Sequence, residues 1–205
     1  IQGQNFTKEV YPTVNLYFSE AGQLQMTEVT EQAVENSLSK ALEAYKKAAQ
    51  VDEKGKKSED MVAGIKKIGE YFNVEATNAY YFNNIEKASE LFESAAKAVA
   101  GAPVNGCDSL SLYNAGFTAW MGGNNDRAKE IFEQCKAIGY YGTDGEIFAK
   151  LADIANKAKD AVAEKAALEE GFAKFPQSQS IIIGLINYYI NSGEDPAALF
   201  QLLEK

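Results

Sequence analysis

The chain has 205 residues, of which 46% are hydrophobic, and it carries a formal net charge of −9 with a pI near 4.7. This length supports a sizeable core, whereas the negative charge disfavours nucleic acid as a partner, because phosphate binding needs clustered Lys and Arg. The longest apolar run, residues 181–186, is far shorter than the roughly 18 residues of a membrane span, so we expect no membrane insertion.

The residues that most often carry catalysis are scarce. The chain has no histidine, which removes the commonest general base and the commonest metal ligand. Cys107 and Cys135 are too far apart for a CxxC motif, so neither a zinc site nor a redox motif is indicated. We expect Cys135 to be a buried, inert thiol and Cys107 to lie in a loop, with a disulfide between them left open. The sequence therefore predicts neither an enzyme nor a cofactor or metal site.

The amino-terminal segment is the hardest part to interpret. An apolar group within residues 1–24 favours a first helix whose start is limited by Pro12, and its members are Val10, Val14, Leu16, Tyr17 and Phe18. From Thr27 onward, apolar residues recur every three or four positions. This spacing predicts a helix that ends at about Asp52.

Helix starts and turns are clearer in the following segments. Ser58 is predicted to open a helix that runs to about Phe82, and Asn83 and Asn84 turn the chain into a helix over 88–99. Residues 101–106 are predicted to form a loop that is an insertion within the domain. Further loops are expected at residues 139–145 and 175–178.

Residues 113–138, which read YNAGFTAWMGGNNDRAKEIFEQCKAI, have the pattern of two helices joined by a glycine turn. Gly116 and Ala128 are small where antiparallel helices must approach closely, Gly123 permits the turn, and Phe132 fills the space beside the next helix. The segment resembles one tetratricopeptide (TPR) repeat. Such a repeat does not bury its apolar face alone, so we expect several in the chain.

The pattern recurs along the chain. A small residue followed four positions later by a large apolar one appears at Ala41/Tyr45, Ala88/Phe92, Ala128/Phe132 and Ala198/Leu202, with Glu164/Leu168 between the last two. Successive pairs are separated by 47, 40, 36 and 34 residues, and the last value matches the roughly 34-residue TPR period. Further close-packing positions carry Ala76, Ala152, Ala48, Ala95, Cys135 and Gly171. The departures from the pattern are Asn83 and Lys159 at turn glycines, Glu164 at the alanine, and Ile186 and Lys205 at small positions.

The resemblance implies an all-α fold, an α-solenoid of antiparallel helix pairs that winds into a right-handed superhelix. It implies one domain over 1–205 with about five helix-pair units. Their approximate ranges are 1–52, 58–100, 108–139, 144–175 and 179–205. The chain ends inside the last expected helix, so we also expect a longer parent protein or a partner at that end.

In the TPR family the first helix of each pair lines a concave surface that binds peptide or protein segments. By resemblance, the partner-binding residues are Asn73, Thr77, Tyr80, Tyr81, Tyr113, Phe117, Trp120, Met121 and Asn187. A core role for Phe117 and Trp120, and a merely solvated role for Asn73 and Asn187, are the alternatives. Only Asn114 and Lys150 fit a carboxylate clamp of the chaperone-binding type, which is therefore disfavoured.

The function implied is a non-catalytic scaffold that binds a protein or peptide partner. Because exposed aromatic rings also suit sugars, a small-ligand or glycan-binding module is the alternative. The resemblance is to bacterial TPR proteins, many of which are exported. A start at Ile1 is compatible with a periplasmic or envelope protein whose signal peptide was removed. The partner's identity, the oligomeric state and the localisation are left open by the sequence.

Overall fold

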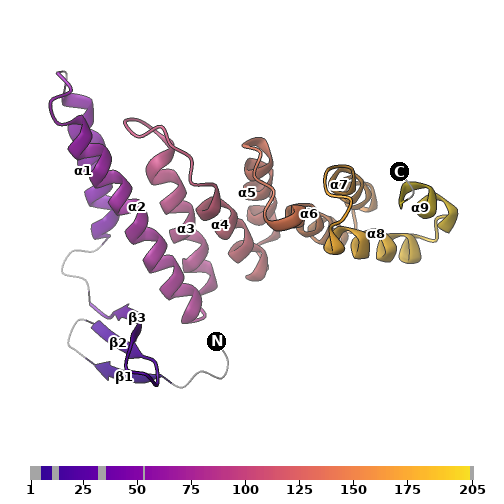
Figure 1. Cartoon of the computed structure of the whole chain (residues 1–205), viewed down its shortest axis with the longest axis horizontal. Coiled ribbons are helices and arrows are strands. Elements are labelled where there is room, and N and C mark those ends of the chain that lie inside the picture. Colours follow the sequence, from indigo (N-terminus) through magenta and orange to yellow (C-terminus); the bar gives the residue numbers. More distant parts are fainter. Residues whose placement is uncertain (1–5, 11–13, 32–35, 53, 204–205) are drawn as a thin grey trace. The chain divides into compact units, whose positions relative to one another are not determined.

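The computed structural model describes residues 6–10, 14–31, 36–52 and 54–203. The protein is mostly helical, as the sequence predicts, and it also contains a small β-sheet (Figure 1). The chain divides into two compact units, one that extends to Thr118 and one that begins at Ala119.

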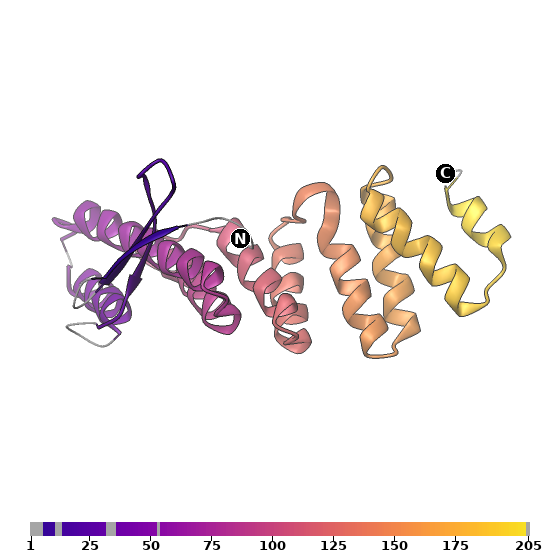
Figure 2. The same cartoon turned by 90° about the horizontal axis from the view of Figure 1, so that it is seen from below.

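The first unit begins with an antiparallel sheet in the order β1-β2-β3, formed by β1 (Thr7–Val10), β2 (Val14–Phe18) and β3 (Leu24–Val29). The β2–β3 turn is closed by the N–H of Gly22, which donates to the carbonyl of Ser19 over 2.9 Å. Gly22 has a φ of 72°, a conformation that glycine adopts without steric cost. Figures 1 and 2 show the strands beside the helices of this unit.

The helix predicted around Val10, Val14, Leu16, Tyr17 and Phe18 is wrong, because these residues lie in β1 and β2. The helix predicted from Thr27 to about Asp52 ends as expected but starts later than predicted. The first group ends in β-branched and aromatic residues that favour strands, and the Gly22 turn that follows them is a hairpin signal. Thr27 lies in β3, and the helix begins only at Ser37; Val34 lies outside the described residues. Within residues 1–52, therefore, the described part forms a sheet and one helix, not a helix pair.

The remaining elements of the first unit are α1 (Ser37–Val51), α2 (Ser58–Tyr81), α3 (Ile85–Ala100) and the first part of α4 (Ser109–Met121). The predicted start of α2 at Ser58 and its predicted end are confirmed. In this unit, a core cluster is formed by Ile68 and Phe72 of α2 and Ala95 of α3, with Leu38 and Leu42 of α1 packed against it. The Tyr17 ring of β2 contacts Phe82 at the end of α2, with a 4.9 Å centroid separation, and this contact attaches the sheet to the helices.

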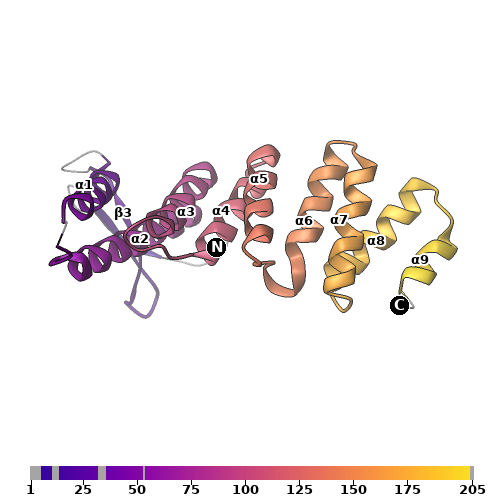
Figure 3. The same cartoon turned by 90° about the horizontal axis from the view of Figure 1, so that it is seen from above.

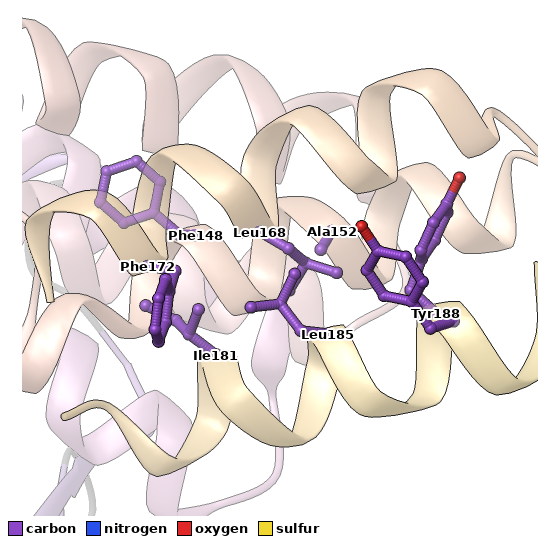
Figure 4. Close-up of a cluster of buried hydrophobic side chains, with 8 residues drawn as sticks. Phe148, Ala152, Leu168, Phe172, Ile181, Leu185 and Tyr188 are labelled. Atoms are coloured by element: carbon purple, nitrogen blue, oxygen red, sulfur yellow. The ribbon is translucent and has the colours of Figure 1, made fainter. Parts of the chain in front are cut away.

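The second unit contains the end of α4, then α5 (Asn125–Ala137), the short 3-10 helix η1 (Thr143–Gly145), α6 (Glu146–Lys157), α7 (Ala161–Lys174), α8 (Gln179–Ser192) and α9 (Pro196–Leu203). Figure 3 shows α6 and α7 as a pair, with α8 beside them. Phe148, Leu168, Ile181 and Leu185 form the centre of its core (Figure 4). Gly171 makes this packing possible, since a Cβ there would lie 2.6 Å from Cβ of Phe148.

Three helix-to-helix turns share one backbone geometry. In the α2–α3, α4–α5 and α6–α7 turns the residues Asn83, Gly123 and Lys159 have φ values of 61°, 80° and 59°. The residue after each donates its N–H to a carbonyl five positions earlier, over 2.8 to 2.9 Å, which is the Schellman C-terminal motif. The side chains of Asn84, Asn124 and Asp160 then cap the next helix by accepting an N–H three residues on. Asn83 and Lys159 therefore occupy the glycine position without changing the turn.

The close-packing positions that the sequence predicts are largely buried. Buried members are Ala76, Ala88, Ala95, Ala128, Cys135 and Ala152, whereas Tyr45, Ala48 and Ile186 are exposed. The side chains of Ala198 and Leu202 lie outside the described part. Cys107 and Cys135 are not joined by a disulfide; Cys135 is buried and Cys107 lies in a loop, both as expected.

Candidate functional site

The predicted binding residues on α2 interact with their own unit. Asn73 accepts a hydrogen bond from the Ser111 hydroxyl over 2.8 Å and donates its amide N–H to Asp108 over 3.3 Å. The Thr77 hydroxyl donates to the carbonyl of Asn73 over 2.8 Å. The two Asn73 bonds join α2 to the start of α4, so Asn73 stabilises this unit whether or not a partner binds, whereas the Thr77 bond stays within α2.

The predicted aromatic residues of the first unit form two ring pairs. Tyr80 and Tyr81 meet edge to face at 5.8 Å, and the Tyr81 side chain is exposed. Tyr113 and Phe117 stack at 6.1 Å along α4. Tyr113 is only 8% exposed, so a partner would contact little of its surface. Its burial assigns it mainly to the core.

In the second unit, Trp120 is at the centre of a polar cluster. Its indole Nε1 donates to Oδ2 of Asp153 over 2.6 Å, and the same oxygen lies 2.7 Å from Nζ of Lys157. The ammonium of Lys150 lies 4.5 Å from the ring centroid, within cation–π range. One α6 carboxylate and two α6 lysines therefore fix the position of this half-buried ring.

The side chain of Lys150 is itself largely shielded from solvent. Its side chain is 14% exposed, and a carboxylate oxygen of Glu146 lies 3.9 Å from its Nζ. Burial lowers the pKa of the Lys150 ammonium, because desolvation outweighs the opposing charges of Glu146 and Asp153. The cluster thus holds a largely buried ammonium group beside the indole ring.

Trp120 and Lys150 line a groove of about 750 Å³. Its other walls come from η1 and the start of α6, from Ala149 and Asp153, and from the loop before α8 with the first turn of that helix. The lining residues on the α8 side are Gln177, Ser178, Gln179 and Ser180. The groove is therefore built within one unit, from α4, α6 and α8.

A row of exposed residues, most of them isoleucines, continues along α8 from this groove. Gln179 lines the groove, and Ile183 and Asn187 follow it at four-residue intervals, which places all three on one side of the helix. Ile183 and Ile190 are 57% and 72% exposed, and Ile186 is exposed beside them. The opposite side of α8 contributes Ile181, Leu185 and Tyr188 to the core. Met121 and Asn187, both predicted to bind, are exposed as well.

The predicted binding residues include Asn187 but neither Ile183 nor Ile190, and the sequence pattern marks Ile186 as a departure from close packing. The exposed isoleucines could have been predicted from the composition of residues 181–190, which are apolar on nearly every side of the helix. A helix with apolar residues on all sides is normally packed against other elements on more than one side.

Among the described residues, no group of three or more Cys, Asp or Glu side chains is placed to hold a metal ion. In the same part of the chain, no helix combines the length and apolarity needed to cross a bilayer.

No protein-family model matches the chain. No curated protein matches it either. One solved structure with a similar arrangement is that of BtubC (BKLC) from P. vanneervenii, with 18% sequence identity and a TM-score of 0.48. The match covers 84% of this chain and 71% of that one. Similarity at this level assigns neither a family nor a function to the chain.

Proposed function

We propose that the protein is a non-catalytic scaffold of TPR-like helical repeats that binds a peptide segment of a partner protein. The proposed binding surface, called the α8 surface below, comprises the groove beside Trp120 and the exposed α8 residues Ile183, Ile186, Asn187 and Ile190.

The repeat character is supported by the turns. The left-handed residues at Asn83, Gly123, Lys159 and Gly193 are separated by 40, 36 and 34 residues, close to the TPR period. The first three carry the same Schellman bonds and the same side-chain cap. Recurrence of backbone geometry at this interval is what a chain of helix-pair repeats produces.

The observation that carries the binding proposal is the second apolar side of α8. Exposed isoleucines at three positions of one helix form a contiguous patch, and patches of this kind mark interaction sites. The core already uses the other side of the helix, so these residues are not needed for packing within the unit. Burying them against a partner would recover roughly 1 to 2 kcal/mol for each isoleucine.

The groove supplies the polar part of such a surface. The amides of Gln177, Gln179 and Asn187 and the hydroxyl of Ser180 offer donors and acceptors to a peptide backbone. Trp120, fixed by Asp153, offers a large rigid side chain of the type that dominates binding energy at interfaces. An apolar row beside a fixed aromatic residue suits an extended or helical peptide.

The proposal is tested by selecting binders from a random peptide library on the immobilised chain. The best peptide is then measured by titration against an Ile183→Asp/Ile190→Asp variant. We expect its affinity to fall by about a hundredfold, since two buried apolar contacts of roughly 1 to 2 kcal/mol each are lost. Val162→Asp on α7 is the matched control, because Val162 is 81% exposed in the same unit and outside the groove.

Unchanged affinity in the double variant, or an equal loss in the Val162→Asp control, would contradict the proposed surface. Circular dichroism checks that both variants keep the helical content of the parent chain.

A further inference from the structure

A second groove lies in the first unit, between β3, the start of α1, α2 and α3. It has a volume of about 770 Å³, which is in the range of sites that bury small ligands and peptide side chains. It is formed wholly within this unit and shares no residue with the α8 surface.

Part of the groove's lining is apolar. Phe72 and Leu38 are part of the core cluster beneath it, while Tyr71, Val74 and Val29 line it and are exposed. The exposed members come from both the sheet and α2. Apolar side chains of a ligand would therefore find contacts on two walls.

The charges around this lining are almost all negative. Among the described lining residues the carboxylates are Glu28, Glu31, Glu75 and Glu90, whereas the cation is Lys87. Lys87 lies 3.3 Å from Glu90 and is thus already paired. Glu28 accepts hydrogen bonds from Asn15 and Tyr17, which fix it at the edge of the sheet.

Glu75 differs from Glu28 and Glu90, which have partners, and from Glu31, which is exposed. It projects from α2 at the groove, and no ion pair or hydrogen bond to it is formed within the described part of the chain. Burial raises the pKa of the Glu75 carboxyl, because no cation near it offsets the desolvation. A half-buried carboxylate in an apolar groove is stabilised by a cation brought in by a ligand.

We infer that this groove binds a peptide segment that carries apolar side chains together with a lysine or arginine, and that Glu75 pairs with the cation. The occupant follows from charge complementarity, since an apolar ligand alone would leave Glu75 desolvated and an acidic one would be repelled by the rim. Arginine fits best, because its planar guanidinium donates two parallel hydrogen bonds to a carboxylate. This site is independent of the α8 surface.

Two fluorescein-labelled synthetic peptides test the inference by anisotropy on the whole chain, one alternating leucine with arginine and one alternating leucine with glutamate. The leucine–arginine peptide is expected to bind and the leucine–glutamate peptide is not. Glu75→Gln should weaken the leucine–arginine complex about tenfold, the equivalent of one charge-assisted hydrogen bond.

Glu59→Gln is the matched control, because it removes one carboxylate from α2 outside the groove and leaves the same net charge. It should change the affinity by less than about twofold, so general attraction to the acidic protein is separated from the groove. Val74→Asn should also weaken the complex, since Val74 is part of the apolar lining.

Equal effects of Glu75→Gln and Glu59→Gln, or equal binding of the two peptides, would overturn the inference. The Ile183→Asp/Ile190→Asp variant should bind the leucine–arginine peptide like the parent chain. If that variant lost the peptide instead, the binding site would be the α8 surface, which would overturn the inference and leave the proposed function standing.

Discussion

Asp153 holds Trp120 and Lys157 with a single carboxylate oxygen, at 2.6 Å from the indole Nε1 and 2.7 Å from Nζ of the lysine. The carboxylate thereby sets the orientation of the chain's one tryptophan from a position 33 residues away. A ring fixed in this way presents the same surface before and after binding, which lowers the entropic cost of association.

Asp153→Ala is predicted to destabilise the second unit by about 1 kcal/mol, because the indole N–H loses its acceptor at a half-buried site. The emission of Trp120 should shift to longer wavelength as water reaches the indole N–H. Urea unfolding followed by tryptophan emission measures both effects. Glu133→Ala, which removes an exposed α5 carboxylate, should leave the emission maximum in place, and an identical shift there would contradict the role assigned to Asp153.

The α6–α7 turn offers a stabilising substitution. Lys159 has a φ of 59°, which costs a residue with a side chain roughly 1 kcal/mol relative to glycine. Lys159→Gly should therefore raise the free energy of unfolding by about that amount. Gly123→Ala at the matching α4–α5 position should lower it to a similar extent, although a Cβ there meets nothing within 4 Å. Thermal unfolding of the two variants tests the prediction, and effects of the same sign would refute it.

These turns show which parts of the fold are predictable from sequence. Helix ends are encoded locally, by Asn84 or Asp160 as caps and by the apolar period, so helices such as α2 and α3 were predicted near their observed bounds. The sheet was not predicted because Val14, Leu16 and Tyr17 were interpreted as an apolar group on a helix, although their strand propensity and the Gly22 turn favour a hairpin.

The candidate site was predictable only in part. Trp120 and Asn187 follow from the repeat register, but the Trp120–Asp153 bond joins residues on different helices, and no local pattern encodes it. The exposed apolar side of α8 could not be identified from the sequence, because residues 181–190 are apolar on nearly every side of the helix. Composition of that kind does not tell which side the core uses.

Two glycine-to-alanine substitutions distinguish a glycine that is required for close helix packing from one that only lowers helix stability. Gly171→Ala should destabilise the protein by about 1 to 3 kcal/mol, because the new Cβ would overlap Phe148 and Ile181. Gly69→Ala should stabilise by about 0.5 to 1 kcal/mol, since its Cβ finds ordinary contacts at 3.6 Å or more and alanine favours the helix. Chemical denaturation of both variants measures the difference. Stabilisation by Gly171→Ala would contradict the packing described for α6 and α7.

Glu194 should make the second unit sensitive to acid. It accepts a hydrogen bond from the Tyr188 hydroxyl at 2.8 Å and lies 2.5 Å from Nζ of Lys165. Lys165, followed by Tyr188, lowers the pKa of the Glu194 carboxyl below 4.5. The stabilisation is therefore complete above pH 4.5 and is lost as the pH falls through the lower pKa of the folded state.

Glu194→Gln is accordingly predicted to be less stable than the parent chain at neutral pH, and the difference should shrink below pH 4.5. The same pair raises the pKa of Lys165 above 10.5, so the difference should also shrink at alkaline pH above that value. Unfolding curves measured from below pH 4.5 to above pH 10.5 test the expected loss of stabilisation at both the acidic and the alkaline end. A difference that persists at low pH would show that the charge of Glu194 is not what stabilises the contact.

The most direct test of the proposed function follows Trp120 during titration with the peptide selected on the immobilised chain. Because Trp120 lines the groove and is the chain's one tryptophan, binding at the α8 surface should shift its emission in proportion to occupancy. The shift should vanish in the Ile183→Asp/Ile190→Asp variant and remain in Val162→Asp. Binding that leaves the emission unchanged, or a shift that survives in the double variant, would contradict a peptide-binding surface formed by the groove and α8.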